Sequence, residues 1–255
     1  MEIKLSGDYW KEKLNKELAS VTSDKASKVG LTIKANKKVE GYYWAIPSMN
    51  LRDLFLENVD TKDTKQNKIL SVLKDNNICN KERCKTCSNY CYNLKGYFYK
   101  NNISSRFNRL LALIENKEEL KARINKQLEK PKSDIVRIHT DGEFFSKEYL
   151  QWWLDIAKEN KHIKFYTYTK QYELFKGVEL PKNMFVQISY NNTLEGELDT
   201  VKSFLKLKNY NIYYTYEKEE EIKDLGVESM KCKGKCETCR QCYTNINKVQ
   251  LCKLH

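Results

Sequence analysis

The stretch that decides the fold is residues 134–169, which read DIVRIHTDGEFFSKEYLQWWLDIAKENKHIKFYTYT. Its two ends, Asp134 to Thr140 and Ile163 to Thr169, are short and rich in β-branched and aromatic residues, and they therefore predict strands. Between them, Lys147 to Glu159 has apolar residues at helical spacing, preceded by Ser146, a residue type that begins helices. A strand, a helix and a second strand in this order predict a right-handed βα unit with parallel strands.

The same alternation continues on both sides of this unit. Further strands are predicted at Val39 to Ile46, Asn183 to Ser189 and Asn211 to Tyr216. Helices are predicted at Ser104 to Leu128, Glu197 to Lys208 and Lys218 to Asp224. Five strands are few for a closed eight-stranded barrel, so the sequence predicts an α/β fold built as a partial (β/α) barrel or an open sheet. In both, ligands bind at the carboxyl edge of the strands.

The composition is that of a folded chain with a full-sized core. Of its 255 residues, 40% are hydrophobic, and the 31% that are charged are too few to indicate disorder. We expect three parts. Residues 1–38 form an N-terminal helical extension, residues 39–230 form the partial barrel, and residues 231–255 form a C-terminal Cys-rich metal-binding segment.

The charge balance is basic, because 46 Lys and Arg residues against 34 Asp and Glu residues give a net charge of +12. This charge favours polyanionic partners, nucleic acid among them. No run of about 18 apolar residues exists, which excludes a transmembrane helix and argues against a membrane partner. Met1 to Ser20 lack the apolar core of a secretory signal. The sequence therefore predicts a cytoplasmic protein whose thiols stay reduced.

Eight of the nine cysteines fall into two groups. The first cysteine group is Cys79, Cys84, Cys87 and Cys91, the second is Cys232, Cys236, Cys239 and Cys242, and Cys252 stands alone near the C-terminus. With two to four residues between neighbours, the thiolates of one group can converge on a single metal centre. Tetrahedral zinc sites and one or two iron–sulfur clusters both fit this pattern. The spacing does not choose between the two metals.

A second set of chemically active residues follows the strand at Asp134 to Thr140. His139, Asp141 and Glu143 surround Gly142, a residue that lets the backbone approach a ligand closely. We take His139 and Asp141 as catalytic candidates, with His139 the one expected to titrate near neutrality. Gly142 and Glu143 are candidates for binding a cofactor. The alternative is a polar turn with His139 hydrogen-bonded in the core. Lys170, at the end of the strand Ile163 to Thr169, is a further candidate for contact with a phosphate or carboxylate.

These residues resemble the phage gene product eighty-eight family, whose members are described as radical-SAM-like. The resemblance spans about residues 40 to 245 and depends on motifs that occur in one order along the chain. They are Ala45-Ile46-Pro47; Cys87-Ser88-Asn89-Tyr90-Cys91-Tyr92 with Arg106-Phe107-Asn108; Arg137-Ile138-His139 and Gly142-Glu143-Phe144 with Tyr149 and Trp153; Tyr166-Thr167-Tyr168-Thr169-Lys170; and Cys236, Cys239 and Cys242.

The resemblance implies a radical-SAM-like partial (β/α) barrel whose cysteines bind a 4Fe-4S cluster. It also implies that Glu143 contacts the methionyl amino group of S-adenosylmethionine, because Asp141-Gly142-Glu143 stands where such enzymes carry a Gly-Gly-Glu motif. The leading hypothesis is thus an iron–sulfur protein that cleaves S-adenosylmethionine for radical chemistry on an unknown substrate. The alternative is a non-enzymatic, zinc-stabilised basic protein that binds nucleic acid or a host partner.

Overall fold

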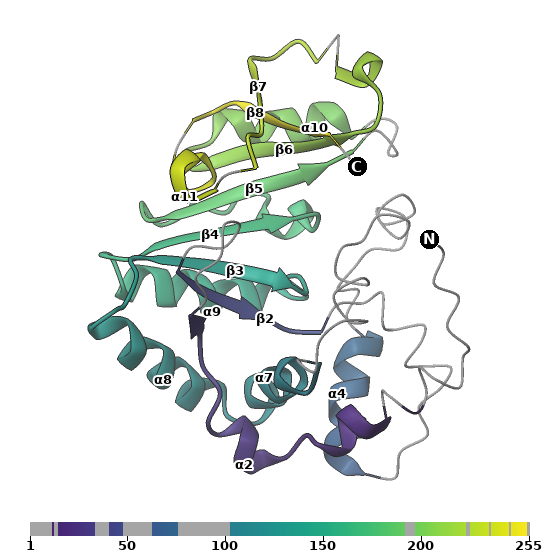
Figure 1. Ribbon diagram of the computed structural model, residues 1–255, viewed down its shortest axis with the longest axis vertical. Helices are drawn as coiled ribbons and strands as arrows, with labels where there is room; N and C mark the ends of the chain where they lie inside the picture. Colours follow the sequence, from purple (N-terminus) through teal and green to yellow (C-terminus); the bar gives the residue numbers. More distant parts are fainter. Residues whose placement is uncertain are drawn as a thin grey trace.

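The computed structural model describes residue 12 and residues 15–33, 41–47, 63–75, 103–191, 197–222, 225–234, 236–244 and 246–253, without the side chains of residues 74, 75, 236 and 237. Within this part the chain forms an α/β fold around one eight-stranded sheet (Figure 1). The strands are β1 Thr32–Ile33, β2 Tyr42–Ala45, β3 Ile135–Asp141, β4 Lys164–Thr169, β5 Met184–Tyr190, β6 Tyr210–Tyr216, β7 Ser229–Lys231 and β8 Val249–Lys253.

The order of the strands in the sheet is β1-β2-β3-β4-β5-β6-β8-β7. Only β1 pairs with its neighbour in an antiparallel direction; the other pairs are parallel. The sheet is open within the described residues, with β1 and β7 as its outer strands. The predicted α/β class is therefore confirmed, and the six neighbouring strands from β2 to β8 all end at one carboxyl edge.

The helices lie between the strands along the chain, and the longer ones contribute to the main hydrophobic core. The longer ones are α4 Thr64–Asp75, α7 Ile103–Glu115, α8 Lys117–Glu129 and α9 Lys147–Glu159; the shorter ones are α2 Ser23–Ala26, α10 Leu198–Ser203 and α11 Cys236–Cys239. Residues 15–19 are also helical, and there are four described 3-10 turns: η1 Tyr172–Phe175, η2 Phe204–Lys206, η3 Glu219–Ile222 and η4 Gln241–Tyr243. None of the described helices is long and apolar enough to cross a membrane.

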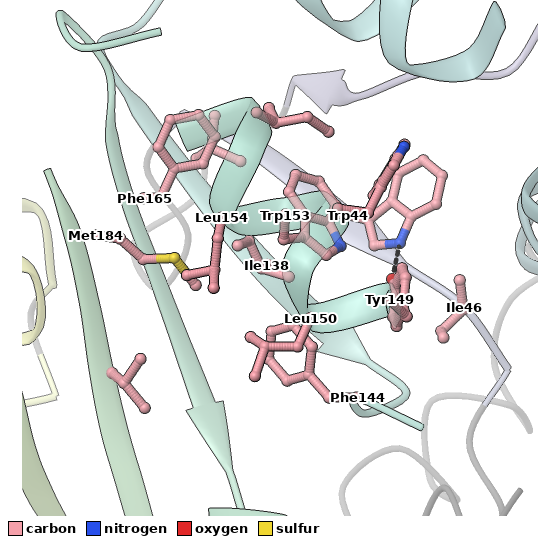
Figure 2. Packing of buried hydrophobic residues seen from close by; sticks show 14 of the residues in the cluster. Trp44, Ile46, Ile138, Phe144, Tyr149, Leu150, Trp153, Leu154, Phe165 and Met184 are labelled. Atoms are coloured by element: carbon pink, nitrogen blue, oxygen red, sulfur yellow. Dashed lines mark hydrogen bonds between the residues drawn. The ribbon is translucent and has the colours of Figure 1, made fainter. Parts of the chain in front are cut away.

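The βα unit at residues 134–169 forms as predicted, as β3, α9 and β4. Ser146 caps α9, since its hydroxyl accepts a hydrogen bond from the backbone N–H of Tyr149 at 3.1 Å. The apolar side of α9 packs against the sheet, and Figure 2 shows Trp153 and Leu154 beside Ile138 of β3. These side chains belong to the main hydrophobic core, which also takes in residues from the N-terminal segment, α4 and α7.

Two helix predictions need correction. The single helix predicted at Ser104 to Leu128 is two helices, α7 and α8, because Asn116 leaves the helical region at φ −143°. Within the described residues, the helix predicted at Lys218 to Asp224 is the short 3-10 turn η3. The strands β1, β7 and β8 have no counterpart in the sequence prediction. Each has five residues or fewer and depends on its neighbour in the sheet for hydrogen bonds.

The face of the sheet opposite α9 is more polar and carries the C-terminal segment. A second, smaller cluster of buried side chains lies there, made of Ile135, Tyr166, Phe185 and Tyr243. The backbone carbonyl of Cys242 in η4 accepts a hydrogen bond from Gln187 Nε2 of β5 at 2.9 Å. This contact holds the turn that contains Cys242 against the middle of the sheet.

Candidate functional site

The carboxyl edge of β3 and β4 gathers the residues that the sequence singles out. β3 ends at Asp141, and Gly142 follows with φ +83°, a conformation that L-residues with side chains rarely adopt. A Cβ atom on Gly142 would lie 2.4 Å from Ile46 Cγ1 and 2.8 Å from the Ile46 carbonyl oxygen. Ile46 in turn donates its backbone N–H to the Asp141 carbonyl at 3.2 Å. Gly142 is therefore required because the chain passes directly against the end of β2.

Glu143 is buried at this edge, and three donors orient its carboxylate. Oε1 accepts hydrogen bonds from Thr169 Oγ1 at 2.9 Å and from the Phe144 backbone N–H at 2.8 Å. Oε2 accepts one from the Lys170 backbone N–H, also at 2.9 Å. Two of these donors come from the end of β4, so the carboxylate of Glu143 ties the carboxyl ends of the two strands together.

Opposing effects give Glu143 a pKa near neutrality. Burial penalises the charged form and raises the pKa of Glu143 from 4.5 to about 7. The three hydrogen bonds and the positive charge of Lys170 act in the opposite direction. A cation bound at Oε2 would likewise lower the pKa of Glu143 and favour the carboxylate form. The backbone N–H of Lys170 donates to this carboxylate. The prediction that the Lys170 side chain meets a phosphate or a carboxylate stays a prediction.

Asp141 is fixed by a different partner. Arg106 of α7 approaches it with Nη1 at 2.5 Å from Oδ2, and the Asp141 side chain is fully buried. Asp141 Oδ1 also accepts the backbone N–H of Gly142 at 2.9 Å. These contacts of Asp141 hold the turn at Gly142 and join α7 to the end of β3.

His139 lies on the side of the sheet that α9 covers, beside Tyr149. It has φ +57° and stands where the pairing of β2 with β3 shifts register between Tyr43 and Ala45. Its ring lies edge-on to Phe144 at 4.5 Å, and Nε2 is 3.0 Å from the Tyr149 hydroxyl. That hydroxyl accepts a hydrogen bond from Trp44 Nε1 at 2.9 Å, drawn as a dashed line in Figure 2.

The expectation that His139 titrates near neutrality is wrong. Burial lowers the pKa of His139 to about 3, so its imidazole is neutral throughout the physiological range. Burial raises the pKa of Glu143, in contrast, to about 7. The placement of His139 matches the alternative of a histidine hydrogen-bonded in the core.

The polar face of the sheet carries a second set of reactive groups, the thiols of the C-terminal segment. Tyr168 donates its hydroxyl to Cys242 Sγ at 2.8 Å, and the Cys242 thiol donates to Gln250 Oε1 at 3.3 Å. Tyr168 of β4 also contacts Tyr213 of β6, and their ring centroids are 5.0 Å apart. Cys242 is therefore held by side chains of β4 and β8 that belong to the sheet itself.

Cys232 and Cys252 lie next to each other where β7 pairs with β8. Their thiols are within hydrogen-bonding contact, and the Tyr213 hydroxyl contacts both. The hydrogen bond with Cys252 is the largest cause that lowers the pKa of Cys232 to about 6, and burial acts against it. The structure thus brings together Cys232 of the second cysteine group and Cys252, which the sequence left without a role.

The metal-site predictions fall only partly on described residues. The first cysteine group, Cys79, Cys84, Cys87 and Cys91, lies outside them, as does the side chain of Cys236. Cys232, Cys239, Cys242 and Cys252 are free thiols, each partly exposed. Among the described side chains, no three of His, Cys, Asp and Glu are close enough together to hold a metal ion.

Four residues of the two sites were missed as functional partners. Arg106 and Tyr149 stand in the motifs of the resemblance, so their positions were marked, although the Asp141 and His139 contacts were not predicted. Thr169 carries a signal of its own, because a hydroxyl at the end of a strand next to β3 faces the same edge. Tyr213 gave no signal, since one tyrosine among 17 is not distinguished by sequence.

A family model described as Gene product 88 matches residues 54–245, which is more than half of the chain. The matched range contains both cysteine groups, the turn at Gly142 and the end of β4. No curated protein matches the chain, and no solved structure matches it.

Proposed function

This chain belongs to the gene product 88 family of phage proteins, and we propose that it is a radical-SAM-like iron–sulfur protein in which Glu143 binds the amino group of S-adenosylmethionine. One observation carries the proposal: a buried, oriented carboxylate at the carboxyl edge of a parallel sheet. Ligands of parallel α/β sheets bind at this edge. In this proposal the open sheet is a partial (β/α) barrel of the radical-SAM-like type.

The Glu143 carboxylate suits an ammonium group by its charge and by its free hydrogen-bonding capacity. A carboxylate has about four acceptor positions, and Glu143 uses two on Oε1 and one on Oε2. Oε2 can therefore accept a further donor without breaking an existing bond. The pKa of about 7 means that ion pairing with a cation is strong only in the deprotonated form.

The cysteines supply the ligands that an iron–sulfur cluster requires, since clusters are held by thiolates. We assign one centre to the first cysteine group and a second centre to Cys232, Cys236, Cys239 and Cys242. Bound together, a 4Fe-4S cluster and S-adenosylmethionine supply one-electron radical chemistry. Glu143 orients the cofactor, Thr169 and Lys170 hold Glu143 in place, and Asp141 with Arg106 fixes the loop that carries it.

The test combines metal analysis with measurement of cofactor binding. Protein purified without oxygen is expected to be brown and to contain several irons per chain. S-adenosylmethionine binding, measured by calorimetry, is expected to weaken about 10- to 100-fold in Glu143→Gln, because a charged hydrogen bond contributes about 1.5–3 kcal/mol. The iron content of the variant should equal that of the unmodified protein.

A matched control is Glu220→Gln, because Glu220 is exposed on η3, away from the carboxyl edge of β3. This variant should bind S-adenosylmethionine as the unmodified protein does. An iron-loaded protein that fails to bind S-adenosylmethionine, or binds it equally well without the Glu143 carboxylate, would contradict the assignment. Release of 5′-deoxyadenosine under reducing conditions would extend the proposal from binding to cleavage.

The second candidate function is that of a zinc-stabilised basic protein that binds nucleic acid. The net charge of +12 favours it, because phosphate contacts through Lys and Arg dominate such binding. It requires a colourless protein with one or two zinc ions per chain. It also requires gel shifts that weaken strongly between about 50 and 200 mM salt. Absence of binding at the lower salt concentration would rule it out.

A further inference from the structure

The end of β7 and the middle of β8 place two thiols side by side. The register of the two parallel strands pairs Met230 with Gln250 and Lys231 with Leu251. The Cys232 backbone N–H donates to the Leu251 carbonyl at 2.7 Å, which continues the same ladder by one residue. Cys232 therefore lies across from Cys252, and the two side chains contact each other directly.

This arrangement meets the geometric requirement of a disulfide. Neighbouring strands lie about 4.8 Å apart in the hydrogen-bonding direction, and the Cα atoms of bonded cysteines are about 4.4–6.8 Å apart. Because the thiols already contact each other, their sulfur atoms can bond through rotation of the side chains. The backbone of β7 and β8 can keep the hydrogen bonds that it has.

Both thiols are also open to reagents from solvent. Cys232 and Cys252 are each partly exposed. β7 has only three residues and is an outer strand of the sheet, so no described strand covers its free side. Lys231 and Lys253, each next to one of the two cysteines in the sequence, carry positive charge near the thiols. The Glu219 carboxylate lies within 4 Å of both ammonium groups.

We propose that Cys232 and Cys252 form a redox-active pair that closes to an intramolecular disulfide by exchange with a low-molecular-weight disulfide. One cysteine attacks the small disulfide as its thiolate, forms a mixed disulfide and releases one small thiol. The second cysteine attacks the mixed disulfide and releases the other small thiol. The two protein sulfurs lose two electrons and two protons, and the small disulfide is reduced to two thiols.

Closure has a consequence for the C-terminal metal centre, and this part rests on the proposed function. A cysteine in a disulfide cannot ligate a metal, because the metal ligand is the thiolate. Oxidation of the pair withdraws Cys232 from the second cysteine group, while Cys239 and Cys242 remain in the loop that the disulfide closes. The pair thus makes assembly of that centre depend on the redox state of the surrounding thiols.

The test uses the purified full-length chain in buffers with increasing ratios of oxidised to reduced glutathione. Remaining thiols are alkylated, and the proteolytic peptides are identified by mass. The expected product is a linked peptide pair containing Cys232 and Cys252, lighter by two hydrogens than the reduced pair. Cys232→Ser and Cys252→Ser should each abolish it completely. Ser229→Ala is the matched control, because Ser229 is exposed on β7 and has no role in either site, and it should form the Cys232–Cys252 disulfide as before.

Three outcomes would overturn the proposal. The first is full alkylation of both cysteines at every ratio, and the second is a dominant disulfide to any other cysteine. The third is protection of both thiols by a bound metal, removed by a chelator, which would make them metal ligands instead. Circular dichroism of Cys252→Ser checks that the variant is folded. Iron content and S-adenosylmethionine binding, measured in parallel, report the proposed function separately from the disulfide.

Discussion

Two regions of one sheet hold its reactive groups in opposite ways. At the carboxyl edge of β3 and β4, the carboxylates of Asp141 and Glu143 are buried, and each is fixed by donors from other elements. On the polar face near β8, the thiols of Cys232 and Cys252 are partly exposed and interact with each other and with Tyr213. The first region fixes its charged groups through partners from several elements, whereas the second leaves its thiols partly open to solvent.

This difference predicts that substitutions at the carboxylate edge cost much more stability than substitutions on the thiol face. Buried charges that lose their partners destabilise strongly, whereas partly exposed polar groups are compensated by water. Four predictions, from the largest expected effect to the smallest, break or sharpen the comparison.

The largest effect is expected for Arg106→Ala. It removes the arginine that pairs with the fully buried Asp141 carboxylate, and such a loss costs about 3–5 kcal/mol in the free energy of unfolding. Urea denaturation measures it. Lys176→Ala is the control, because Lys176 pairs with Glu173 on the surface at 2.7 Å and should cost less than about 1 kcal/mol. Equal effects of the two variants would show that the Asp141 pair is not a buried one.

The second prediction is that the free energy of unfolding depends on pH through the titration of Glu143. Its pKa rises from 4.5 to about 7 on folding, so the folded state holds the proton more tightly than the unfolded state. The resulting stability is fully present below pH 4.5 and is lost as the pH rises through about 7. The total is on the order of 3 kcal/mol.

Glu143→Gln removes this titration. Denaturation curves between pH 4.5 and 8 should show a smaller fall in stability with rising pH than those of the unmodified protein. A variant with an unchanged pH profile would assign the dependence to another group. Addition of S-adenosylmethionine, if it binds as proposed, should stabilise the unmodified protein more at pH 8 than at pH 6, because only the carboxylate pairs with the ammonium group.

Gly142→Ala tests the close approach that forms the turn. The new Cβ atom meets Ile46 Cγ1 at 2.4 Å in a backbone conformation with φ +83°. We expect a loss of about 2–3 kcal/mol from overpacking together with strain. The matched control is Gly177→Ala, which has φ +73° but no atom within 4 Å of the new Cβ, and which should cost only about 1 kcal/mol. A difference near zero would remove the steric argument for Gly142.

The smallest effect is expected on the thiol face. Tyr168→Phe removes the hydroxyl that donates to Cys242 Sγ at 2.8 Å, and loss of one such bond costs about 1 kcal/mol. Thermal unfolding measures the change, and the rate of Cys242 alkylation reports the freed thiol. Tyr216→Phe is the control, because its hydroxyl lies 3.4 Å from Glu219 Oε1 near the surface. A loss from Tyr168→Phe as large as that from Arg106→Ala would erase the contrast between the regions.

Much of the fold was predictable, and the errors have local causes. β3, α9 and β4 follow from hydrophobic periodicity, because each element buries a continuous face. The break between α7 and α8 was missed because the apolar spacing continues across Asn116. β8 escaped prediction because Val249 to Lys253 is short, polar in part, and extended only through pairing with β6 and β7.

The candidate site was half predictable. Gly142 between two acidic residues at the end of a strand pointed to the carboxyl edge from sequence alone. The identity of the group that titrates near neutrality was predicted wrongly, because His139 and Glu143 differ in burial and partners rather than in residue type alone. Nor could Cys252 be assigned to Cys232, since the two are 20 positions apart (252 minus 232) and meet only through the pairing of β7 with β8.

The sequence by itself determined the strand–helix–strand alternation and the position of its acidic turn, because periodicity and glycine act through local backbone geometry. Only the tertiary structure decided that Glu143, rather than His139, titrates near neutrality and which thiols meet. Desolvation and contact depend on groups from distant parts of the chain: Thr169 and Lys170 at Glu143, Arg106 at Asp141, and Tyr213 at Cys232. These groups come close to one another only when β3, β4, β6 and β8 lie in one sheet.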